Sequence, residues 1–279
     1  MMSKKQFDDL WGNSIESLRP KITIPDYNDY LIREGMLEDY LDIFRGHSTR
    51  DREGSIKMPY PHPFFNADGT PKLVKTPCIK YILVGEAPPR LNTSIYNNCT
   101  PIAGDTNNTY IYDIRHVGQT PWVSAPRIAF GARPYRPCPQ NKIECLLDLA
   151  SKGVLLLDLF SFAIDFTTDI RLSLNAAGIT LNFWNNLLNP YNLQERINTL
   201  GPLLCNDWDL SFVAPYTISE FIVNPANGFP PLTIVPPGLH PANFRLLMPD
   251  PTRCGGSPFK KVCISRAGFP SAHLIRISF

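Results

Sequence analysis

The sequence lacks the closely spaced cysteine pairs that hold structural zinc or an iron–sulfur cluster. Its seven cysteines are spread along 279 residues, and no C-x-x-C occurs. Such sites need ligands at short, regular spacing, so we expect no metal and no cofactor. The odd number of cysteines and the lack of a signal peptide further predict reduced thiols and a cytoplasmic protein.

The chain also lacks an unbroken apolar run of membrane-spanning length. Its longest, from Val154 to Ile164, is interrupted by Asp158 and is too short to cross a bilayer, so we expect no membrane partner. Neither G-x-x-x-x-G-K nor G-x-G-x-x-G follows the apolar run that ends at Gly85, which argues against an enzyme that binds phosphate there.

The chain also lacks a large excess of positive or negative charge. The net charge is only +2 at pH 7, too small to indicate nucleic-acid binding from composition. Basic residues do gather in two stretches, although scattered solvated charge explains them equally well. These stretches contain Arg115, Arg127, Arg133 and Arg136, and then Arg245, Arg253, Lys260 and Lys261.

Proline, in contrast, is abundant. The chain has 28 prolines, about twice the usual share of roughly 5%, and we expect stiff connections rather than disorder. A loop from 86 to 140 shows little periodicity, and loops that long within a compact domain are usually functional.

Three short apolar runs end abruptly in polar residues. They lead into Gly85-Glu86-Ala87-Pro88, into Asp158 and into His240-Pro241. Continuous apolar runs of this kind predict strands of a parallel sheet that are buried on both faces. Ligands of open α/β sheets bind outside the carboxyl ends of the strands, so we expect Glu86, Asp158 and His240 to converge on one crevice.

The remaining periodicity predicts helices and further strands around these runs. We expect helices within 4–46, where Gly46 ends the second, at 141–151 with Asn141 as a possible cap, and at 180–200. Strands are expected at 210–213 and 232–235, with a last one within 258–279. Residues 1–75 are predicted to form a helical extension packed on an α/β domain at 76–279.

The order of these motifs resembles the uracil-DNA glycosylase superfamily, over roughly 78–250. Gly85-Glu86-Ala87-Pro88 is similar to the first motif of the family 4 and family 5 enzymes. The run from Gly153 to Asp158 is similar to the second-strand motif of the family 1 enzymes, which ends in Asn. His240-Pro241-Ala242-Asn243-Phe244-Arg245 resembles the third motif, whose loop intercalates into DNA.

The resemblance implies a three-layer αβα sandwich around a four-stranded parallel sheet. It also implies cleavage of an N-glycosidic bond after the nucleotide is flipped out of the duplex. His240 would stabilise the charge that develops on the leaving base. Glu86, with Asp105 or Asp113 as alternatives, would position or deprotonate the attacking water.

The chain departs from the family patterns at several positions. Ala87 stands where family 1 enzymes carry the Asp that orients the water, and the four cluster cysteines of family 4 have no counterpart. Pro101-Ile102-Ala103-Gly104 resembles a family 4 segment whose Phe stacks on the base. Ile102 stacks poorly, so Tyr110, Tyr96 or Tyr112 is expected to replace it.

Asp158 is the departure that bears most on the substrate. An Asn donates to uracil O4, whereas a carboxylate only accepts hydrogen bonds. A carboxylate suits the amino group of cytosine. Excising plain cytosine would damage the host genome, so Asp158 favours a modified cytosine, and by resemblance a role in phage defence.

The sequence therefore predicts a monomeric DNA glycosylase that acts on a flipped pyrimidine and leaves an abasic site. Gly85, Ala87, Ile102, Tyr110 and Asp158 are predicted to bind the base. Contacts with the DNA are predicted for Arg90, Asn243, Phe244 and Arg245, with Phe244 as the wedge that replaces the flipped nucleotide.

Other interpretations stay open. The protein could be a uracil-DNA glycosylase in base-excision repair or an inactive DNA-binding module with the same fold. For single residues, Glu86 and Asp158 could cap local turns, His240 could be a structural loop histidine, and Phe244 could belong to the core.

Overall fold

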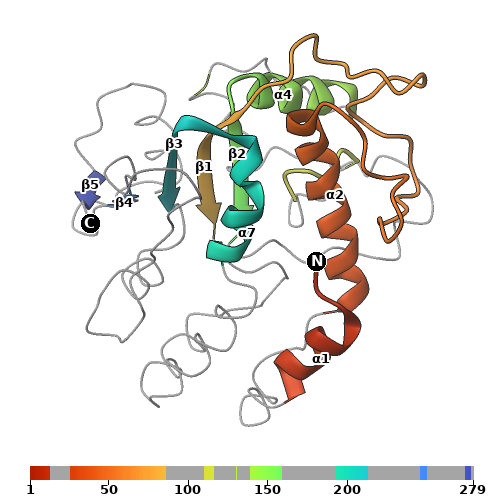
Figure 1. The fold of residues 1–279 in the computed structure, drawn as a ribbon, viewed down its shortest axis with the longest axis horizontal. Coiled ribbons are helices and arrows are strands. Elements are labelled where there is room, and N and C mark those ends of the chain that lie inside the picture. The colour runs from red at the N-terminus through yellow and green to blue at the C-terminus, as the bar shows by residue number, and fades with distance from the viewer. Residues whose placement is uncertain are drawn as a thin grey trace.

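A five-stranded sheet in the order β2-β1-β3-β4-β5 forms the centre of the computed structural model (Figure 1). β1 is parallel to β2 and β3, β3 is parallel to β4, and β5 is antiparallel to β4. The strands span Ile79–Gly85 (β1), Val154–Asp158 (β2), Leu204–Phe212 (β3), Leu246–Pro249 (β4) and Leu274–Ile277 (β5). The structure describes residues 1–12, 26–85, 110–115, 130, 139–158, 193–212, 246–249 and 274–277.

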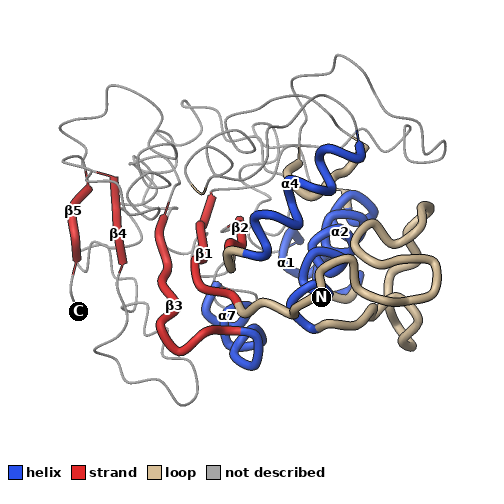
Figure 2. The backbone as a smooth tube through the Cα atoms, turned by 90° about the horizontal axis from the view of Figure 1, so that it is seen from above, coloured by secondary structure: helices blue, strands red, loops and turns tan. Residues whose placement is uncertain are grey.

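Helices α1, α2 and α4 lie together on the β2 side of the sheet, away from β4 and β5 (Figures 1 and 2). The helices are α1 (Lys4–Gly12), α2 (Tyr27–Arg45), α4 (Pro139–Ser151) and α7 (Leu193–Leu200), followed by the short 3₁₀ helix η3 (Gly201–Leu203). α4 packs on β2, and α2 packs on α4. The structure thereby confirms the predicted combination of helices with a parallel sheet, for the strands β2, β1 and β3. The four-stranded glycosylase sandwich and the domain boundary at residue 75 stay predictions.

Strands β1 and β2 follow from their apolar sequences. Ile79, Ile82, Leu83 and Val84 of β1 are buried, and so are the first four residues of β2. Gly153 makes the tight entry into β2, with φ of 72°. A Cβ on Gly153 would lie 2.7 Å from the Cys78 carbonyl oxygen, so only glycine fits where this turn approaches the start of β1.

Several element boundaries differ from the sequence predictions. The predicted cap at Asn141 is wrong, because α4 already begins at Pro139, and a proline at the first helical position has no N–H that needs a partner. β3 begins at Leu204, earlier than predicted, because Leu204 already pairs with Ile79, before the β1–β3 register shifts at Tyr81. β5 lies within the predicted 258–279 segment, and the strand predicted at 232–235 lies outside the described residues.

Side chains satisfy the outer edge of β2, which has no strand beside it in the described sheet. The Tyr40 hydroxyl donates to the Val154 carbonyl at 2.7 Å, and Arg196 Nη1 donates to the Asp158 carbonyl at 2.6 Å. Between them, the Tyr112 hydroxyl donates to the Leu156 carbonyl at 2.7 Å and accepts from the Leu156 N–H at 2.9 Å. These contacts supply the hydrogen bonds that a neighbouring strand would provide.

Helix α2 is buried on most of its surface. Asp26 caps its first turn by accepting from the Asn28 N–H. The helix ends at Gly46, with φ of 74°, and this end is the one that the sequence predicts. Three carboxylates of α2 (Asp29, Asp39 and Asp42) are buried, together with the guanidinium of Arg33. Burying charge is costly unless it is paired, so these side chains require specific partners.

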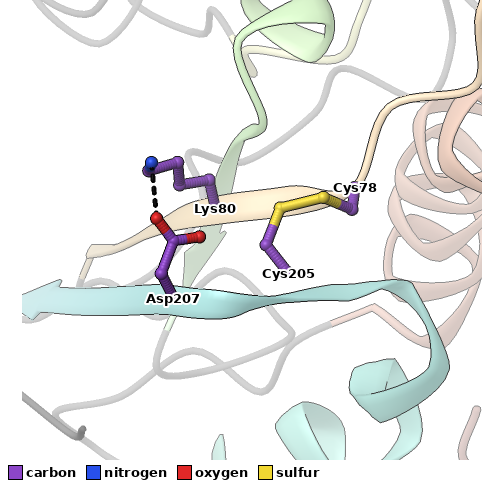
Figure 3. Close-up of a disulfide and its surroundings, with 4 residues drawn as sticks. All are labelled: Cys78, Lys80, Cys205 and Asp207. Atoms are coloured by element: carbon purple, nitrogen blue, oxygen red, sulfur yellow. Dashed lines mark ion pairs between the residues drawn. A yellow bond between two sulfur atoms is a disulfide. The ribbon is translucent and has the colours of Figure 1, made fainter.

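A disulfide joins Cys78 to Cys205 and ties the start of β1 to β3, with the Cα atoms 5.2 Å apart. Figure 3 shows it beside the ion pair of Lys80 and Asp207, whose charged atoms are 2.6 Å apart. The expectation of reduced thiols is therefore wrong for this pair. The parallel pairing of β1 with β3 brings together two cysteines that are 127 residues apart, and cysteine counting cannot reveal this. The predicted cytoplasmic location stays a prediction, and the disulfide weighs against it.

We expect removal of this disulfide to destabilise the protein. Disulfides typically contribute about 2–4 kcal/mol. Urea unfolding of the Cys78→Ser/Cys205→Ser variant, against the oxidised wild type, measures the loss. Dithiothreitol should lower the stability of the wild type and leave the double variant unchanged. An equal effect of the reductant on both proteins would contradict the assignment.

We expect Tyr112→Phe to lower the free energy of unfolding by about 1–3 kcal/mol, because it leaves buried backbone groups of Leu156 without a partner. Tyr81→Phe is the matched control, since the structure gives its hydroxyl no hydrogen bond among the described residues. Denaturant unfolding of both variants makes the comparison. Equal stabilities would show that water replaces the Tyr112 hydroxyl at the strand edge.

Candidate functional site

The strands β1 and β2 end side by side. Gly85 and Asp158 are register partners, and Phe212 at the end of β3 is the partner of Val84. Because these three strands are parallel, their carboxyl ends meet at one edge of the sheet. This is the edge where open α/β folds bind ligands, so it is the candidate site.

The structure describes three of the residues predicted for this site, namely Gly85, Tyr110 and Asp158. The others lie outside the described residues, and their convergence stays a prediction. They are Glu86, Ala87, Arg90, Ile102, Asp105, His240, Asn243, Phe244 and Arg245.

Asp158 is half-buried at the end of β2. Its carbonyl accepts from Arg196 Nη1, while Arg196 Nη2 lies 3.9 Å from Glu34 Oε1 of α2. Arg196 therefore ties the last residue of β2 to two helices, α7 and α2. This contact fixes the backbone that carries the Asp158 side chain.

Tyr110 and Tyr112 lie close to Asp158 and are almost completely buried. Their rings meet edge to face at 5.5 Å, and the Arg33 guanidinium lies 5.4 Å from the Tyr110 ring centre. Burial, followed by the Asp158 charge, raises the pKa of Tyr110. Burial raises the pKa of Tyr112 as well, and Asp158 adds to it. Both phenols thus stay protonated and can donate hydrogen bonds at neutral pH.

Asp113 is one of the residues predicted as alternatives for activating water. In the structure its carboxylate pairs with Arg115. It is completely buried and accepts from Arg115 Nε at 2.9 Å and from Arg115 Nη2 at 3.0 Å. A carboxylate bound in this bidentate manner is a weak base. Asp113 is therefore suited to hold the 110–115 turn rather than to take a proton from water.

Lys142 is a further residue of this region that the sequence prediction missed. Its side chain is buried, and its ammonium donates to the Tyr110 carbonyl at 3.1 Å and to the Asp113 carbonyl. Burial lowers the pKa of Lys142 to about 8. The available signal was a lysine inside the apolar face of α4, beside Ile143 and Leu146.

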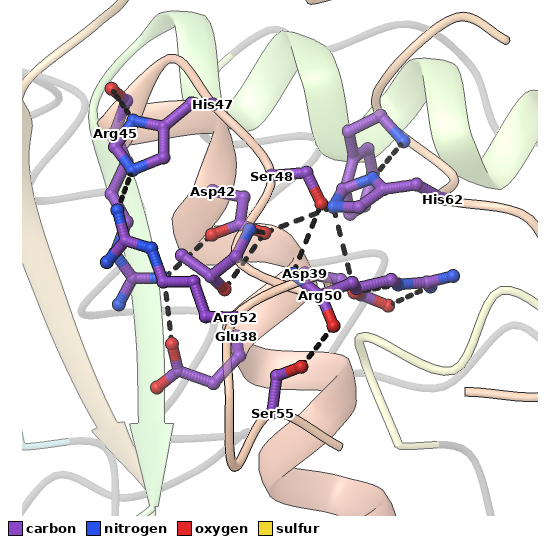
Figure 4. Close-up of polar contacts among 12 residues, drawn as sticks. Glu38, Asp39, Asp42, Arg45, His47, Ser48, Arg50, Arg52, Ser55 and His62 are labelled. Carbon is purple, nitrogen blue, oxygen red and sulfur yellow. Dashed lines mark hydrogen bonds and ion pairs between the residues drawn. The ribbon is translucent and has the colours of Figure 1, made fainter. Parts of the chain in front are cut away.

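A second polar cluster lies on α2 and the segment that follows it (Figure 4). His62 Nε2 is 3.2 Å from Asp42 Oδ2 and 3.7 Å from Asp39 Oδ1. Arg50 binds both oxygens of Asp39, at 2.7 and 2.6 Å. Arg45 Nη1 donates to Asp42 Oδ1 at 2.8 Å, and the Thr49 N–H donates to Asp42 Oδ2 at 2.8 Å. Helix α2, the 49–50 turn and His62 are thereby joined around two buried carboxylates.

The cluster has the ligand types of a metal site, since one ligand atom each from Asp39, Asp42 and His62 lies within 4.8 Å of the others. Its hydrogen bonds fit a metal poorly. The Phe64 N–H points to His62 Nδ1 at 3.2 Å, so Nδ1 is the acceptor and Nε2 carries the proton that Asp42 accepts. Both imidazole nitrogens and all four carboxylate oxygens are engaged, so we interpret the cluster as a structural network.

Comparison with protein-family models, with curated proteins and with solved structures found no match for this chain. Within the ranges that the structure describes, no helix has the length and hydrophobicity needed to span a membrane. The interpretation of the site therefore depends on its residues and geometry.

We expect Asp42→Asn to lower the free energy of unfolding at pH 7 by about 3 kcal/mol, the scale for breaking a buried charged pair. Burial alone would raise the pKa of Asp42, but hydrogen bonds from His62, Thr49 and Arg45 together lower it. Because the folded-state pKa lies below the unfolded value, the stabilisation is complete above the unfolded value of about 3.9 and is lost as the pH falls through the folded one.

The measurement is urea unfolding at a series of pH values between 2 and 7. Asp42→Asn should lose that acid-dependent part of the stability, whereas the exposed Asp51→Asn should behave like the wild type. If both variants keep the wild-type pH dependence, Asp42 is not the group that titrates.

Proposed function

We propose that the protein is a DNA glycosylase that flips a pyrimidine out of DNA and hydrolyses its N-glycosidic bond, with modified cytosine as the favoured base. The observation that carries this proposal is the pairing of Gly85 with Asp158. The first motif starts at Gly85 and the second motif ends at Asp158. A base held between these two residues would therefore contact both motifs.

Asp158 supplies the base specificity in this proposal. Its carboxylate accepts a hydrogen bond from the exocyclic amino group of cytosine, a contact that uracil cannot offer. Arg196 fixes the backbone of Asp158 at 2.6 Å. The protonated phenol of Tyr110 adds a hydrogen-bond donor and an apolar ring close to the same carboxylate.

His240 and Glu86 carry the chemistry in this proposal. When the bond breaks, the base leaves as an anion and the sugar develops positive charge. His240 donates to the base oxygen and stabilises the anion, while Glu86 directs a water molecule to the sugar, with Asp105 as the alternative. The products are the free base and an abasic site.

The remaining features of the proposal follow the resemblance to the glycosylase superfamily. The sheet would form the middle of a three-layer sandwich with four parallel strands, and the protein would act as a monomer on duplex DNA. Arg90, Asn243 and Arg245 would bind the strand, and Phe244 would fill the gap left by the flipped nucleotide. An apolar wedge offsets part of the cost of unstacking.

We expect the wild-type protein to produce abasic sites in duplexes that carry glucosylated hydroxymethylcytosine, with less or no product from uracil or plain cytosine. Asp158→Asn should lose about 1–3 kcal/mol of discrimination for the amino-bearing base, the cost of one mispaired contact, and should gain action on uracil. Quantifying abasic sites by alkaline strand cleavage measures both effects.

His240→Ala is the control for the chemistry, with an expected loss of about 10²–10³ in the chemical step and little change in DNA affinity. Uracil cleavage by the wild type would favour the repair enzyme instead. Retained DNA binding without any cleavage would favour the inactive DNA-binding module.

A further inference from the structure

A cavity of about 260 Å³ lies where α1, α2, α7 and the end of β2 meet. Leu37, Leu41, Leu157 and Leu200 form its apolar wall, and Glu34 and Arg196 face it from opposite helices. A water molecule occupies about 30 Å³ of liquid volume, so the space suits a ligand with on the order of ten non-hydrogen atoms. An apolar wall with a few polar groups is typical of small-ligand sites.

Glu34 is the polar group in this wall that has capacity left for a ligand. Its side chain is only 13% exposed, and Arg196 Nη2, its ion-pair partner, is 3.9 Å away, too far for a hydrogen bond. Among the described residues the carboxylate accepts no hydrogen bond. A carboxylate in this position without a protein donor takes its hydrogen bonds from water, and a bound ligand with N–H donors can replace that water.

Three other polar side chains around the cavity already have partners. Arg196 donates to the Asp158 carbonyl. Glu38 pairs with Arg45 at 2.7 Å. The Tyr30 hydroxyl accepts from the Met2 N–H at 2.6 Å. Since these contacts stay in place, a ligand is recognised through Glu34, and the leucines hold its apolar part.

We propose that this cavity binds a small, flat cation of the amidine or amine class, with Glu34 as the acceptor of its N–H groups. The proposal is independent of the glycosylase function, because it uses none of the residues predicted for base recognition. A carboxylate pairs best with a planar donor that offers two parallel N–H groups, and a body of one ring matches the volume of the cavity.

Protonation of Glu34 would compete with such a ligand. Burial raises the pKa of Glu34, Arg196 and the amino terminus oppose the shift, and Glu38 adds to it. A cation binds the ionised carboxylate. Its affinity should therefore fall as the pH decreases through the raised pKa, and binding should displace the proton.

The test uses the full chain and three ligands of one shape: benzamidine (cationic), benzamide (neutral) and benzoate (anionic). Isothermal titration and amide chemical-shift mapping should detect benzamidine at the cavity, with benzamide weaker and benzoate not bound. Glu34→Gln should bind benzamidine at least about tenfold more weakly, the scale of losing one charge-assisted hydrogen bond. The exposed Asp8→Asn should bind like the wild type.

Equal binding of all three ligands, equal affinity of Glu34→Gln and wild type, or no binding of benzamidine would overturn the proposal. If Glu34→Gln does not fold, the wild type still decides. Its benzamidine affinity must then fall with decreasing pH while its benzamide affinity falls less, and parallel pH profiles for the two ligands would contradict the assignment.

Discussion

The outer edge of β2 is the constraint on which the rest of the structure depends. Its carbonyl groups alternate in direction, so those of Val154, Leu156 and Asp158 all point away from β1. Each needs a donor, and each receives one from a different segment of the chain: Tyr40 of α2, Tyr112 of the 110–115 turn, and Arg196 of α7. The need of these carbonyls for donors thus helps to position α2, the 110–115 turn and α7 against β2.

The same principle governs the buried charges of α2. Asp39 and Asp42 are held by Arg45 at the end of the helix and by Arg50, Thr49 and His62, which follow it. Because a lone buried carboxylate is costly, this segment has to fold back onto α2. The polar, proline-rich stretch after α2 is therefore an ordered part of the structure. Arg50 also contacts the Tyr60 carbonyl and ring, which fixes the next part of the stretch.

The sequence predicts the parts of the fold that depend on local pattern. Continuous apolar runs identify β1 and β2 with their ends at Gly85 and Asp158, and helical spacing with Gly46 identifies α2. The disulfide and the early start of β3 depend on which strands become neighbours, and local patterns do not contain that information. The sequence also does not reveal the partner of a buried charge such as Lys142, although a lysine on an apolar face is a recognisable signal.

The candidate site divides in a similar way. The prediction that the motif ends come together rests on parallel strands. The structure places Gly85 beside Asp158, and the convergence of Glu86 and His240 with them stays a prediction. The tasks of Asp113 and Tyr112 could not be predicted, because their types fit both a catalytic and a structural role. Only the position of their partners, Arg115 and the backbone of Leu156, distinguishes the two roles.

The closure of the β2 edge has a consequence for the order of events during synthesis on the ribosome. The hydrogen bonds that cover this edge join residues that are 114, 44 and 38 positions apart. Contacts of such long range form slowly, and the third cannot form before Arg196 leaves the exit tunnel. Until then the last carbonyl of β2 has no partner from α7, and unpaired strand edges of this kind are prone to pair with other chains.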